Sequence, residues 1–336
     1  MKIIILSTCF SPFVGGIEVI TDFLAKALVK DGNQVCVITW TKEMSEENHP
    51  FEVLRNPSII ALIKKINWAN VIVENNPSLK LSWPNIFFRK PLLVVLHTWL
   101  FKEGKSSIWN TLLKKYWISL AHQVLVVSEA LKNECAPNAK VIENPYRANI
   151  FKIHNEIPRN KDFVFLGRLV SDKGVDLAIR AVHELKNKNQ NFNLTIIGKG
   201  AQEKYLKDLA LNLGVVDFID FKGQIVGKEL AKLLNQHKFI LIPSKWEEPF
   251  GMVAIEAMAC GCIPIVSQSG GLPEAVGNAG LIFKKNNLSD LAEKIERITT
   301  DESMQQNLIN NRNLHLEKYH SDKVAKKYVT YVNKLF

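Results

Sequence analysis

Two glutamates near a predicted helix start are the residues of this chain best placed to do chemistry. Glu248 and Glu256 flank a Pro-Phe-Gly turn at 249–251 and an apolar, alanine-rich stretch that predicts a helix. A helix start carries unpaired N–H groups and a partial positive charge, so it favours a phosphate or another anion. The carboxylates can instead accept hydrogen bonds from the hydroxyls of a sugar or a ribose. Two glutamates eight positions apart also occur on solvated helix faces, so their surroundings must decide between these interpretations.

The surroundings favour a functional role. Short apolar runs at 238–244 and 262–268 predict a strand before the pair and another after it, which gives a strand–turn–helix context. The whole string over 243–261, PSKWEEPFGMVAIEAMACG, resembles the Glu-x7-Glu signature of the retaining GT-B glycosyltransferases of family 4. The resemblance covers most of the chain and is strongest over 162–283.

The resemblance implies a role for each residue around this turn. Glu256 would hold the ribose hydroxyls of a nucleotide-diphosphate sugar, which is the donor substrate, and Glu248 would hold the sugar that is transferred. The turn and the first helical residues would add donor contacts, from Phe250, Gly251, Met252 and Val253.

A pair of cations follows another predicted strand, at 162–168. Arg168 ends this strand, and Asp172-Lys173-Gly174 is predicted to open the next helix. Two cations beside a helix N-terminus suit a diphosphate, although either one alone would be an ordinary surface or capping residue. The string GRLVSDKGVDLAI resembles the family's Gly-Arg-Leu…Lys-Gly pattern, which favours diphosphate binding by Arg168 and Lys173.

Two glycine-containing segments are weaker candidates. Gly198, in the Ile-Ile-Gly-Lys-Gly run at 196–200, lets a ligand approach the backbone, and the run resembles the family's segment beside the nucleotide base. The Ser-Gly-Gly-Leu-Pro-Glu run at 269–274 is either part of the site or an ordinary turn before a helix.

The first half of the chain contributes Gly16 and His97. Pro12, the pair Gly15-Gly16 and Glu18 together resemble the family's first loop, where backbone N–H groups approach the donor phosphate or the acceptor hydroxyl. This loop is not a Gly-x-Gly-x-x-Gly fingerprint, which argues against a dinucleotide dehydrogenase. A lone histidine at a strand end is more often structural, but the family often places one here, near the donor sugar and the acceptor. His97-Thr98 departs from the frequent His-Asp pair.

Strand and helix patterns alternate along both halves. Apolar runs without polar alternation are typical of parallel strands that are buried on both faces. Such runs occur at 2–8, 34–40, 70–76, 92–98, 123–129, 162–168, 193–199, 217–223, 238–244, 262–268 and 279–283. Helical patterns lie between them, for example at 17–32 and 173–189. The pattern predicts an α/β protein with two doubly wound Rossmann-like domains facing a cleft, the GT-B architecture.

The domain boundary is predicted within the polar, proline-containing segment 143–161. We expect an acceptor-side domain over 1–147 and a nucleotide-sugar-binding domain over 148–318. The resemblance implies that a last helix, within 319–336, packs back on the first domain. Asn144-Pro145 stands where the family usually has Asn-Gly, which puts the local hinge geometry in question.

Composition bounds the cell compartment and the partners. The chain has 336 residues, a net charge of +10 and no apolar run of the ~20 residues that span a bilayer. Its start predicts a strand rather than a signal peptide. Five cysteines, an odd number, indicate reduced side chains in the cytoplasm. The positive charge points to anionic partners. Lys and Arg do not cluster along one recognition element, so nucleic acid is not an expected partner.

The stretch 98–121 leaves a membrane role open. It combines aromatic residues with lysines, an arrangement that suits either an anionic bilayer surface or a helix packed on the sheet. The chain is therefore expected in the cytoplasm, free or peripheral at the inner face of the membrane. In the membrane case, the acceptor is expected to be a lipid-linked glycan of a bacterial envelope polysaccharide.

The predicted activity is transfer of a glycosyl group from a nucleotide-diphosphate sugar to a glycan or lipid-linked acceptor. Glu248, His97, Arg168 and Lys173 are the expected catalytic residues. No Asp-x-Asp motif and no His/Cys cluster has metal-ligand spacing, so neither a metal nor another cofactor is expected. The family implies retention of configuration by front-face displacement. Two alternatives remain, a sugar-nucleotide 2-epimerase of the same architecture and a non-catalytic nucleotide-sugar-binding subunit.

Overall fold

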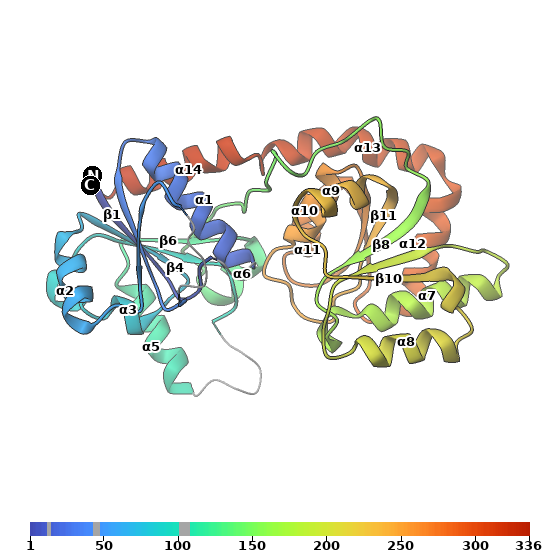
Figure 1. Ribbon diagram of the computed structural model, residues 1–336, viewed down its shortest axis with the longest axis horizontal. Coiled ribbons are helices and arrows are strands. Elements are labelled where there is room, and N and C mark those ends of the chain that lie inside the picture. Colours follow the sequence, from blue (N-terminus) through green and yellow to red (C-terminus); the bar gives the residue numbers. More distant parts are fainter. Residues whose placement is uncertain (12–14, 43–47, 101–107) are drawn as a thin grey trace. The chain divides into compact units, whose positions relative to one another are not determined.

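The computed structural model describes residues 1–11, 15–42, 48–100 and 108–336. It divides the chain into two compact units (Figure 1). The first unit contains residues 1–145 and 322–336, and the second contains 146–321. Each unit is a parallel sheet covered by helices on both faces, so the prediction of two doubly wound α/β domains is confirmed.

The first unit has a seven-stranded parallel sheet in the order β3-β2-β1-β4-β5-β6-β7. Its strands are β1 (Lys2–Ser7), β2 (Gln34–Thr39), β3 (Glu52–Arg55), β4 (Val71–Asn75), β5 (Leu92–Leu96), β6 (Gln123–Val126) and β7 (Lys140–Val141). The register places Ile4 of β1 opposite Cys36 on one side and Ile72 on the other. The strand order reverses between β1 and β4.

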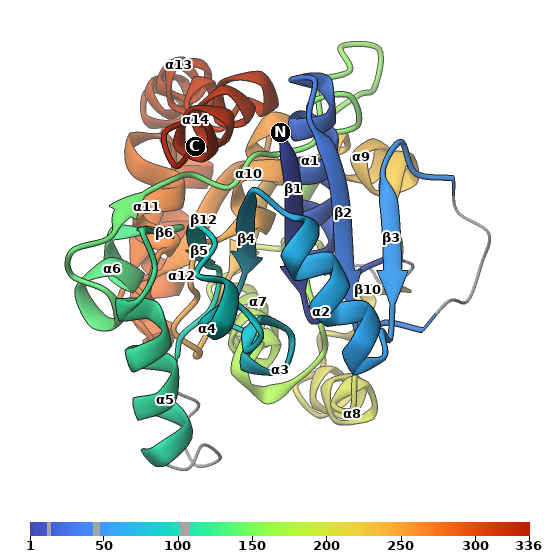
Figure 2. The ribbon, with the colours of Figure 1, turned by 90° about the vertical axis from the view of Figure 1, so that its left-hand side faces the viewer.

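Helices cover the two faces of this sheet as right-handed crossovers require. The face with α1 (Gly16–Lys30) also carries the C-terminal helix α14 (Ser321–Asn333), whose Val324, Tyr328 and Val332 join the core of the first unit. Figures 1 and 2 show α2 on the opposite face from α1. Helix α2 (Ile59–Trp68) belongs to a crossover that runs toward β7, and so do the helices after it. These are α3 (Leu79–Ser82), α4 (Asn85–Phe88), α5 (Ile108–Ser119) and α6 (Glu129–Cys135).

The second unit has a six-stranded parallel sheet in the order β10-β9-β8-β11-β12-β13. Its strands are β8 (Lys161–Leu166), β9 (Leu194–Ile197), β10 (Ile219–Gly223), β11 (His237–Ile242), β12 (Ile263–Ser267) and β13 (Leu281–Phe283). Phe239 of β11 lies opposite Phe163 and Ile263 in its two neighbours. The order reverses between β8 and β11, which places the topological switch point of this sheet between those strands.

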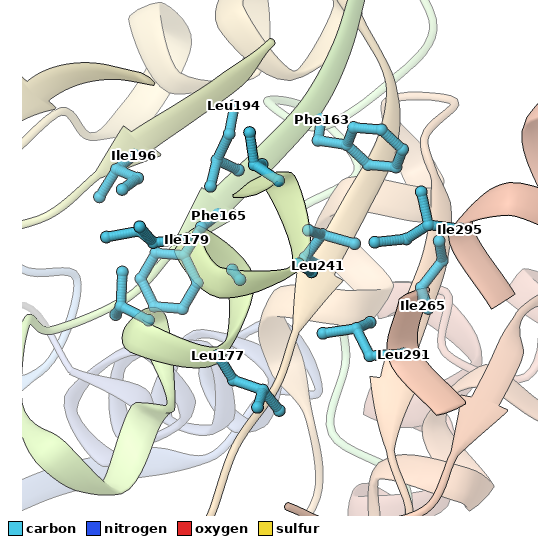
Figure 3. Packing of buried hydrophobic residues seen from close by; sticks show 14 of the residues in the cluster. Phe163, Phe165, Leu177, Ile179, Leu194, Ile196, Leu241, Ile265, Leu291 and Ile295 are labelled. Atoms are coloured by element: carbon cyan, nitrogen blue, oxygen red, sulfur yellow. The ribbon is translucent and has the colours of Figure 1, made fainter. Parts of the chain in front are cut away.

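The helices of the second unit are α7 (Val175–Asn187), α8 (Glu203–Asn212), α9 (Gly227–Asn235), α10 (Met252–Ala259), α11 (Leu272–Val276), α12 (Leu288–Thr300) and α13 (Glu302–Glu317). Figure 3 shows the core between the sheet and two of these helices. Phe163, Leu241 and Ile265 of the sheet meet Ile179 of α7 and Ile295 of α12 there.

Three predicted boundaries were wrong for local reasons. The helix predicted at 173–189 begins only at Val175, because Gly174 has a left-handed conformation after a short 3-10 turn, Ser171–Lys173. Short 3-10 turns also delay the start of two strands, β10 to Ile219 and β13 to Leu281. The edge strands β3 and β7 were not predicted, since they are short and less buried than the central strands.

All five cysteines are free, with Cys9 exposed and the other four buried. Within the described part of the chain, no helix has the length and the hydropathy needed to cross a bilayer.

Candidate functional site

A charged pair occupies the switch point of the second sheet. The loops that leave β8 and β11 bring Lys173 and Glu248 together, with 2.5 Å between Nζ and Oε1. The Ser244 hydroxyl donates to the same carboxylate oxygen at 2.8 Å. Both charged side chains are about four-fifths buried, with 20% and 17% of their surface exposed. The sequence motifs assign Lys173 and Glu248 to different parts of the donor, and the structure places the two side chains in direct contact.

The two loops interlock through their backbones. The carbonyl oxygen of Asp172 accepts N–H groups from Lys245 at 2.8 Å and from Trp246 at 3.0 Å. Gly174 has φ +67°, and a Cβ there would lie 1.9 Å from the carbonyl oxygen of Pro243. Only glycine satisfies both the conformation and this close approach. The position of Lys173 therefore depends on the glycine that follows it.

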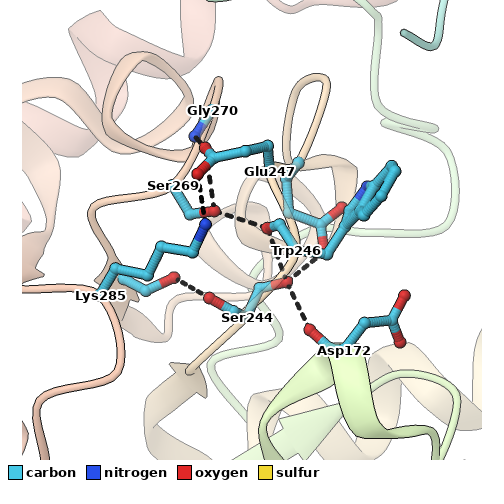
Figure 4. Close-up of polar contacts among 9 residues, drawn as sticks. Asp172, Ser244, Trp246, Glu247, Ser269, Gly270 and Lys285 are labelled. Carbon is cyan, nitrogen blue, oxygen red and sulfur yellow. Dashed lines mark hydrogen bonds and ion pairs between the residues drawn. The ribbon is translucent and has the colours of Figure 1, made fainter. Parts of the chain in front are cut away.

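A second carboxylate, Glu247, ties a glycine turn to this loop (Figure 4). Its Oε2 accepts the N–H of Gly270 at 2.5 Å, and its other oxygen forms an ion pair with Lys285. The Ser269 hydroxyl donates to the carbonyl oxygen of Trp246 at 2.5 Å. Burial raises the pKa of Glu247, but the hydrogen bonds from Lys285 and Gly270 outweigh it, so the pKa is lowered. Glu247 is thus held ionised as a clamp, a role that sequence reasoning missed.

The same turn supports the backbone of Glu248. Gly271 donates its N–H to the carbonyl oxygen of Glu248 at 2.7 Å. A Cβ on Gly270 would lie 2.1 Å from that oxygen. The role left open for the 269–274 segment is therefore at least structural, because these glycines let the turn pack against Glu248.

Helix α10 starts immediately after this loop. The N–H groups of Met252 and Val253 have no acceptor within the helix, as at every helix start. Gly251 has φ +136°, and a Cβ there would lie 2.9 Å from Leu272. The Phe250 ring is buried against Tyr319, with 5.5 Å between the centroids. Any contact of Phe250 with a ligand must therefore come from its backbone.

Glu256 lies on the second turn of α10, beside an arginine that sequence reasoning did not select. The Glu256 carboxylate lies 3.4 Å from Nη2 of Arg147 and is 12% exposed. The Arg147 guanidinium also lies over the Phe151 ring, 5.0 Å from its centroid. Burial raises the pKa of Glu256 to about 7, and the charge of Arg147 opposes this increase. Arg147 falls in the segment that the sequence marks only as a domain boundary, so no motif indicated it.

This raised pKa predicts a pH-dependent stability. Between about pH 4.5 and 7, the unfolded state loses the Glu256 proton while the folded state keeps it, so stability falls as pH rises and then levels off. The shift corresponds to a loss on the order of 3 kcal/mol. Between pH 5 and pH 8, we expect the melting temperature of Glu256→Gln to fall less than that of the wild type. Glu203→Gln, at a partly exposed surface glutamate that pairs with Lys207, is the matched control. An unchanged pH dependence in Glu256→Gln would contradict the assignment.

Arg168 and Gly198 flank this centre without contacting it directly. Arg168 is exposed just beyond the carboxyl end of β8. Gly198 follows β9 with φ +147°, and a Cβ there would lie 1.8 Å from the carbonyl oxygen of Gly167. The fold alone therefore requires glycine at 198, whether or not a ligand contacts it.

The first unit holds His97 at the carboxyl end of β5. Its Nε2 lies 2.6 Å from Oδ1 of Asn75, and its backbone N–H donates to Asn76 at 2.7 Å. Asn75 donates its amide hydrogens to Thr21 and to the carbonyl oxygen of Ile17. Oδ1 of Asn75 therefore accepts, so Nε2 of His97 carries the hydrogen and Nδ1 keeps its lone pair.

The environment of His97 keeps the ring neutral. Burial lowers the pKa of His97 to about 4, although the nearby side chain of Asn144 opposes this decrease. A neutral imidazole with a fixed tautomer can accept a hydrogen bond from a hydroxyl group at Nδ1, while its low pKa makes it a weak base. His97 also has a structural role, because the contact of its ring with Asn75 joins the ends of β5 and β4.

Gly16 begins α1 and is exposed, whereas Pro12 of the same predicted loop lies outside the described residues. A Cβ on Gly16 would meet nothing within 4 Å. We expect Gly16→Ala to fold normally, with a stability change within about 0.5 kcal/mol. If a ligand approaches the backbone here, the same methyl group should reduce activity. A variant with the wild-type melting temperature and wild-type activity would remove Gly16 from the site.

The described residues contain no group of three or more His, Cys, Asp or Glu side chains arranged to hold a metal ion. The arrangement offers instead a cation, a helix start and carboxylates in the second unit, and a neutral histidine in the first.

Comparisons with solved structures define the class of protein. The chain matches the structure of Alr3699/HepE from Anabaena in complex with UDP, with a TM-score of 0.85, 19% identity and coverage of 99% and 100% of the two chains. It also matches sucrose-phosphate synthase from Thermosynechococcus elongatus, with a TM-score of 0.82, 20% identity and coverage of 100% and 99%. The fold is that of the GT-B glycosyltransferases.

Family models then give the family. Residues 147–315 match the model for glycosyl transferases group 1, and residues 14–147 match the model for glycosyltransferase family 4. The chain is a glycosyltransferase that belongs to this family, so the resemblance seen in the sequence is confirmed.

Curated relatives agree with this assignment. An uncharacterized glycosyltransferase of Methanocaldococcus jannaschii, MJ1607, is 28% identical, and the match covers 98% of this chain and 97% of the relative. A glycogen synthase of Mycobacterium tuberculosis is 35% identical over 64% of this chain and 56% of its own length. The relatives with named activities match only in part, so their substrates do not define those of this chain.

Proposed function

We propose that this chain transfers a sugar from a nucleotide-diphosphate sugar to a glycan or lipid-linked acceptor, with retention of configuration and without a metal ion. The observation that carries the proposal is the Lys173–Glu248 pair at the switch point of the second sheet, where the loop after β8 supplies the cation and the loop between β11 and α10 supplies the carboxylate. A diphosphate requires the cation, and sugar hydroxyls require the acceptor oxygens.

The proposed reaction assigns a task to each group. The bond between the anomeric carbon and a diphosphate oxygen breaks, and the acceptor oxygen bonds to that carbon on the same face. The acceptor proton passes to the departing phosphate. Lys173, Arg168 and the N–H groups of Met252 and Val253 would stabilise the charge that develops on the leaving group. Glu248 would hold the transferred sugar.

The remaining residues complete the proposed binding site. Glu256 would accept hydrogen bonds from the ribose hydroxyls, and its pKa of about 7 makes this acceptor strongest above neutral pH. The backbones of Gly198 and Gly251 would allow close approach of the nucleotide. His97 and Gly16 would act on the acceptor side.

Structures in the comparison support the donor class. Alr3699/HepE, which is 21% identical to this chain, has been crystallised with UDP-glucose. WaaG, a glycosyltransferase involved in lipopolysaccharide biosynthesis, matches with a TM-score of 0.70, 16% identity and coverage of 98% and 99%. We propose that the activity belongs to the synthesis of a bacterial envelope polysaccharide and takes place at the inner face of the membrane, and the likeness to WaaG supports the first of these.

Thermal stabilisation by nucleotide sugars tests the donor assignment. The protein is heated with UDP-, GDP-, ADP-, CMP- or dTDP-linked sugars in the presence of EDTA. A ligand that binds the folded state raises its stability by mass action, by about 2.7 kcal/mol at a hundredfold excess over Kd. We expect stabilisation by one nucleotide family, and a smaller effect in Lys173→Met. No stabilisation by any of them would contradict the proposal.

Product analysis with the identified donor separates transfer from the alternatives. Transfer gives a glycosylated acceptor with the anomeric configuration of the donor. Release of free epimerised nucleotide sugar would indicate an epimerase, and binding without turnover would indicate a non-catalytic subunit. An inverted product would contradict the retaining mechanism, and loss of turnover in EDTA that a divalent cation restores would contradict metal independence.

A further inference from the structure

Helix α5 of the first unit carries an exposed apolar stripe. Its inner face is anchored to the sheet, because Trp117 is buried and donates its indole N–H to Glu74 at 2.6 Å. Its outer face presents Trp109, Leu112, Leu113 and Tyr116, at 75%, 51%, 52% and 65% exposure. These positions are spaced i, i+3, i+4 and i+7, so they form one stripe along the helix. The face that packs on the sheet and the exposed apolar stripe are therefore opposite faces of one helix.

The neighbouring helices extend this apolar character. The chain forms α4 between β4 and β5 and α5 between β5 and β6, so the two lie in adjacent crossovers on one face of the sheet. Helix α4 exposes Ile86 and Phe87, the latter at 74%. We call the exposed side chains of α4 and α5 the α4–α5 face. A soluble surface rarely gathers so many large apolar side chains without a partner.

The segment that carries this face is rich in basic residues. From residue 56 to 122, the described part of the chain includes seven Lys and Arg residues. The only acidic residue described there, Glu74, is fully buried under Trp117. Arg89 directly after α4, Lys80 on α3 and Lys115 on α5 are exposed. Within the described part of residues 56–122, the charged side chains that reach solvent are therefore all basic, whereas α6 beyond it exposes Glu129 and Glu134.

We propose that the α4–α5 face docks onto an anionic lipid bilayer. Large apolar side chains beside Lys and Arg are the combination that an anionic membrane surface binds, since the apolar groups enter the acyl boundary and the cations meet the headgroups. Trp109 and Tyr116 have apolar rings with a polar tip, which suits the interface. A second copy of the chain is a poorer occupant, because a twofold interface would oppose two positively charged faces.

Vesicle flotation of the protein tests whether the α4–α5 face docks onto an anionic bilayer. We expect binding to vesicles of phosphatidylcholine with about a third phosphatidylglycerol, weak binding to phosphatidylcholine alone, and release of the protein as salt is raised. Leu112→Ser/Leu113→Ser should lower the partition coefficient at least about tenfold, because two partly inserted leucines are lost. Arg89→Gln/Lys115→Gln should weaken binding to the anionic vesicles.

Matched controls come from the second unit, where Leu211 and Leu314 are 64% and 77% exposed. Leu211→Ser/Leu314→Ser should bind vesicles as the wild type does. Stabilisation by the nucleotide sugar should be unchanged in every variant, which separates this proposal from that on the donor site. Equal binding to both vesicle types, or wild-type binding by Leu112→Ser/Leu113→Ser, would overturn the proposal. A dimer in solution that this double substitution dissociates would identify a second copy as the occupant and also overturn it.

Discussion

Gly174→Ala is expected to destabilise the second unit severely. The new Cβ would lie 1.9 Å from the carbonyl oxygen of Pro243, which belongs to the backbone and cannot rotate away. The alanine would also keep a φ of +67°, which costs about 1 kcal/mol or more by itself. Relief of the overlap requires the loops after β8 and β11 to separate. We expect a total loss of about 4 kcal/mol or more, measured by denaturant unfolding.

Gly214→Ala isolates the conformational part of this effect. Gly214 has φ +65°, almost the same as Gly174, but a Cβ there would meet nothing within 4 Å. We expect this control to lose only about 1 kcal/mol. Similar losses in the two variants would show that the close approach to Pro243 does not hold the loops together. A folded Gly174→Ala protein should still lose stabilisation by the donor, because Lys173 precedes the displaced glycine.

Lys173→Met is expected to lower turnover by about 10²- to 10³-fold, with a smaller effect on melting temperature. Methionine keeps much of the side-chain volume but removes the cation that, among the described residues, forms the ion pair with Glu248. Removal of one preorganised group that stabilises developing charge costs about this much in other enzymes. Release of nucleoside diphosphate from the donor, at saturating concentration, measures the change.

Lys245→Met is the matched control for this substitution. Lys245 lies on the loop that carries Glu248, but it forms its ion pair with Asp176, at 2.8 Å. We expect at most a fewfold change in its turnover. If both variants lost activity equally, the effect would come from the loop's overall charge, and the specific role of Lys173 would be excluded.

The strands were predictable because burial on both faces leaves a simple signal. Runs such as 92–96 and 238–242 are apolar at nearly every position, and every central strand coincides with such a run. The edge strand β3 has mixed exposure and only four residues, so its pattern does not differ from that of a loop. The short turn before α7 escaped prediction because a glycine two residues after an acidic residue is compatible with several helix starts.

The candidate site was predictable only as far as local motifs extend. Lys173 and Glu248 were each selected from their own segment, but their contact joins residues 75 positions apart. The clamp formed by Glu247, Gly270 and Lys285 likewise depends on three separate loops. For α5, the sequence shows apolar residues around the whole helix. Only the packing of Trp117 on Glu74 decides which of them face solvent.

The first unit is built from two separate segments of the chain, so it cannot be completed until the second segment has been synthesised. Its sheet is complete by residue 145, but Val324, Tyr328 and Val332, all fully buried, come from beyond the second unit. A ribosome that adds ~5–20 residues per second needs roughly ten to thirty-five seconds to make the intervening part. During this time the face of the nascent sheet that α1 covers lacks its second helix, α14. The second unit can thus finish folding while the first, although translated earlier, still exposes an apolar surface to which a chaperone can bind.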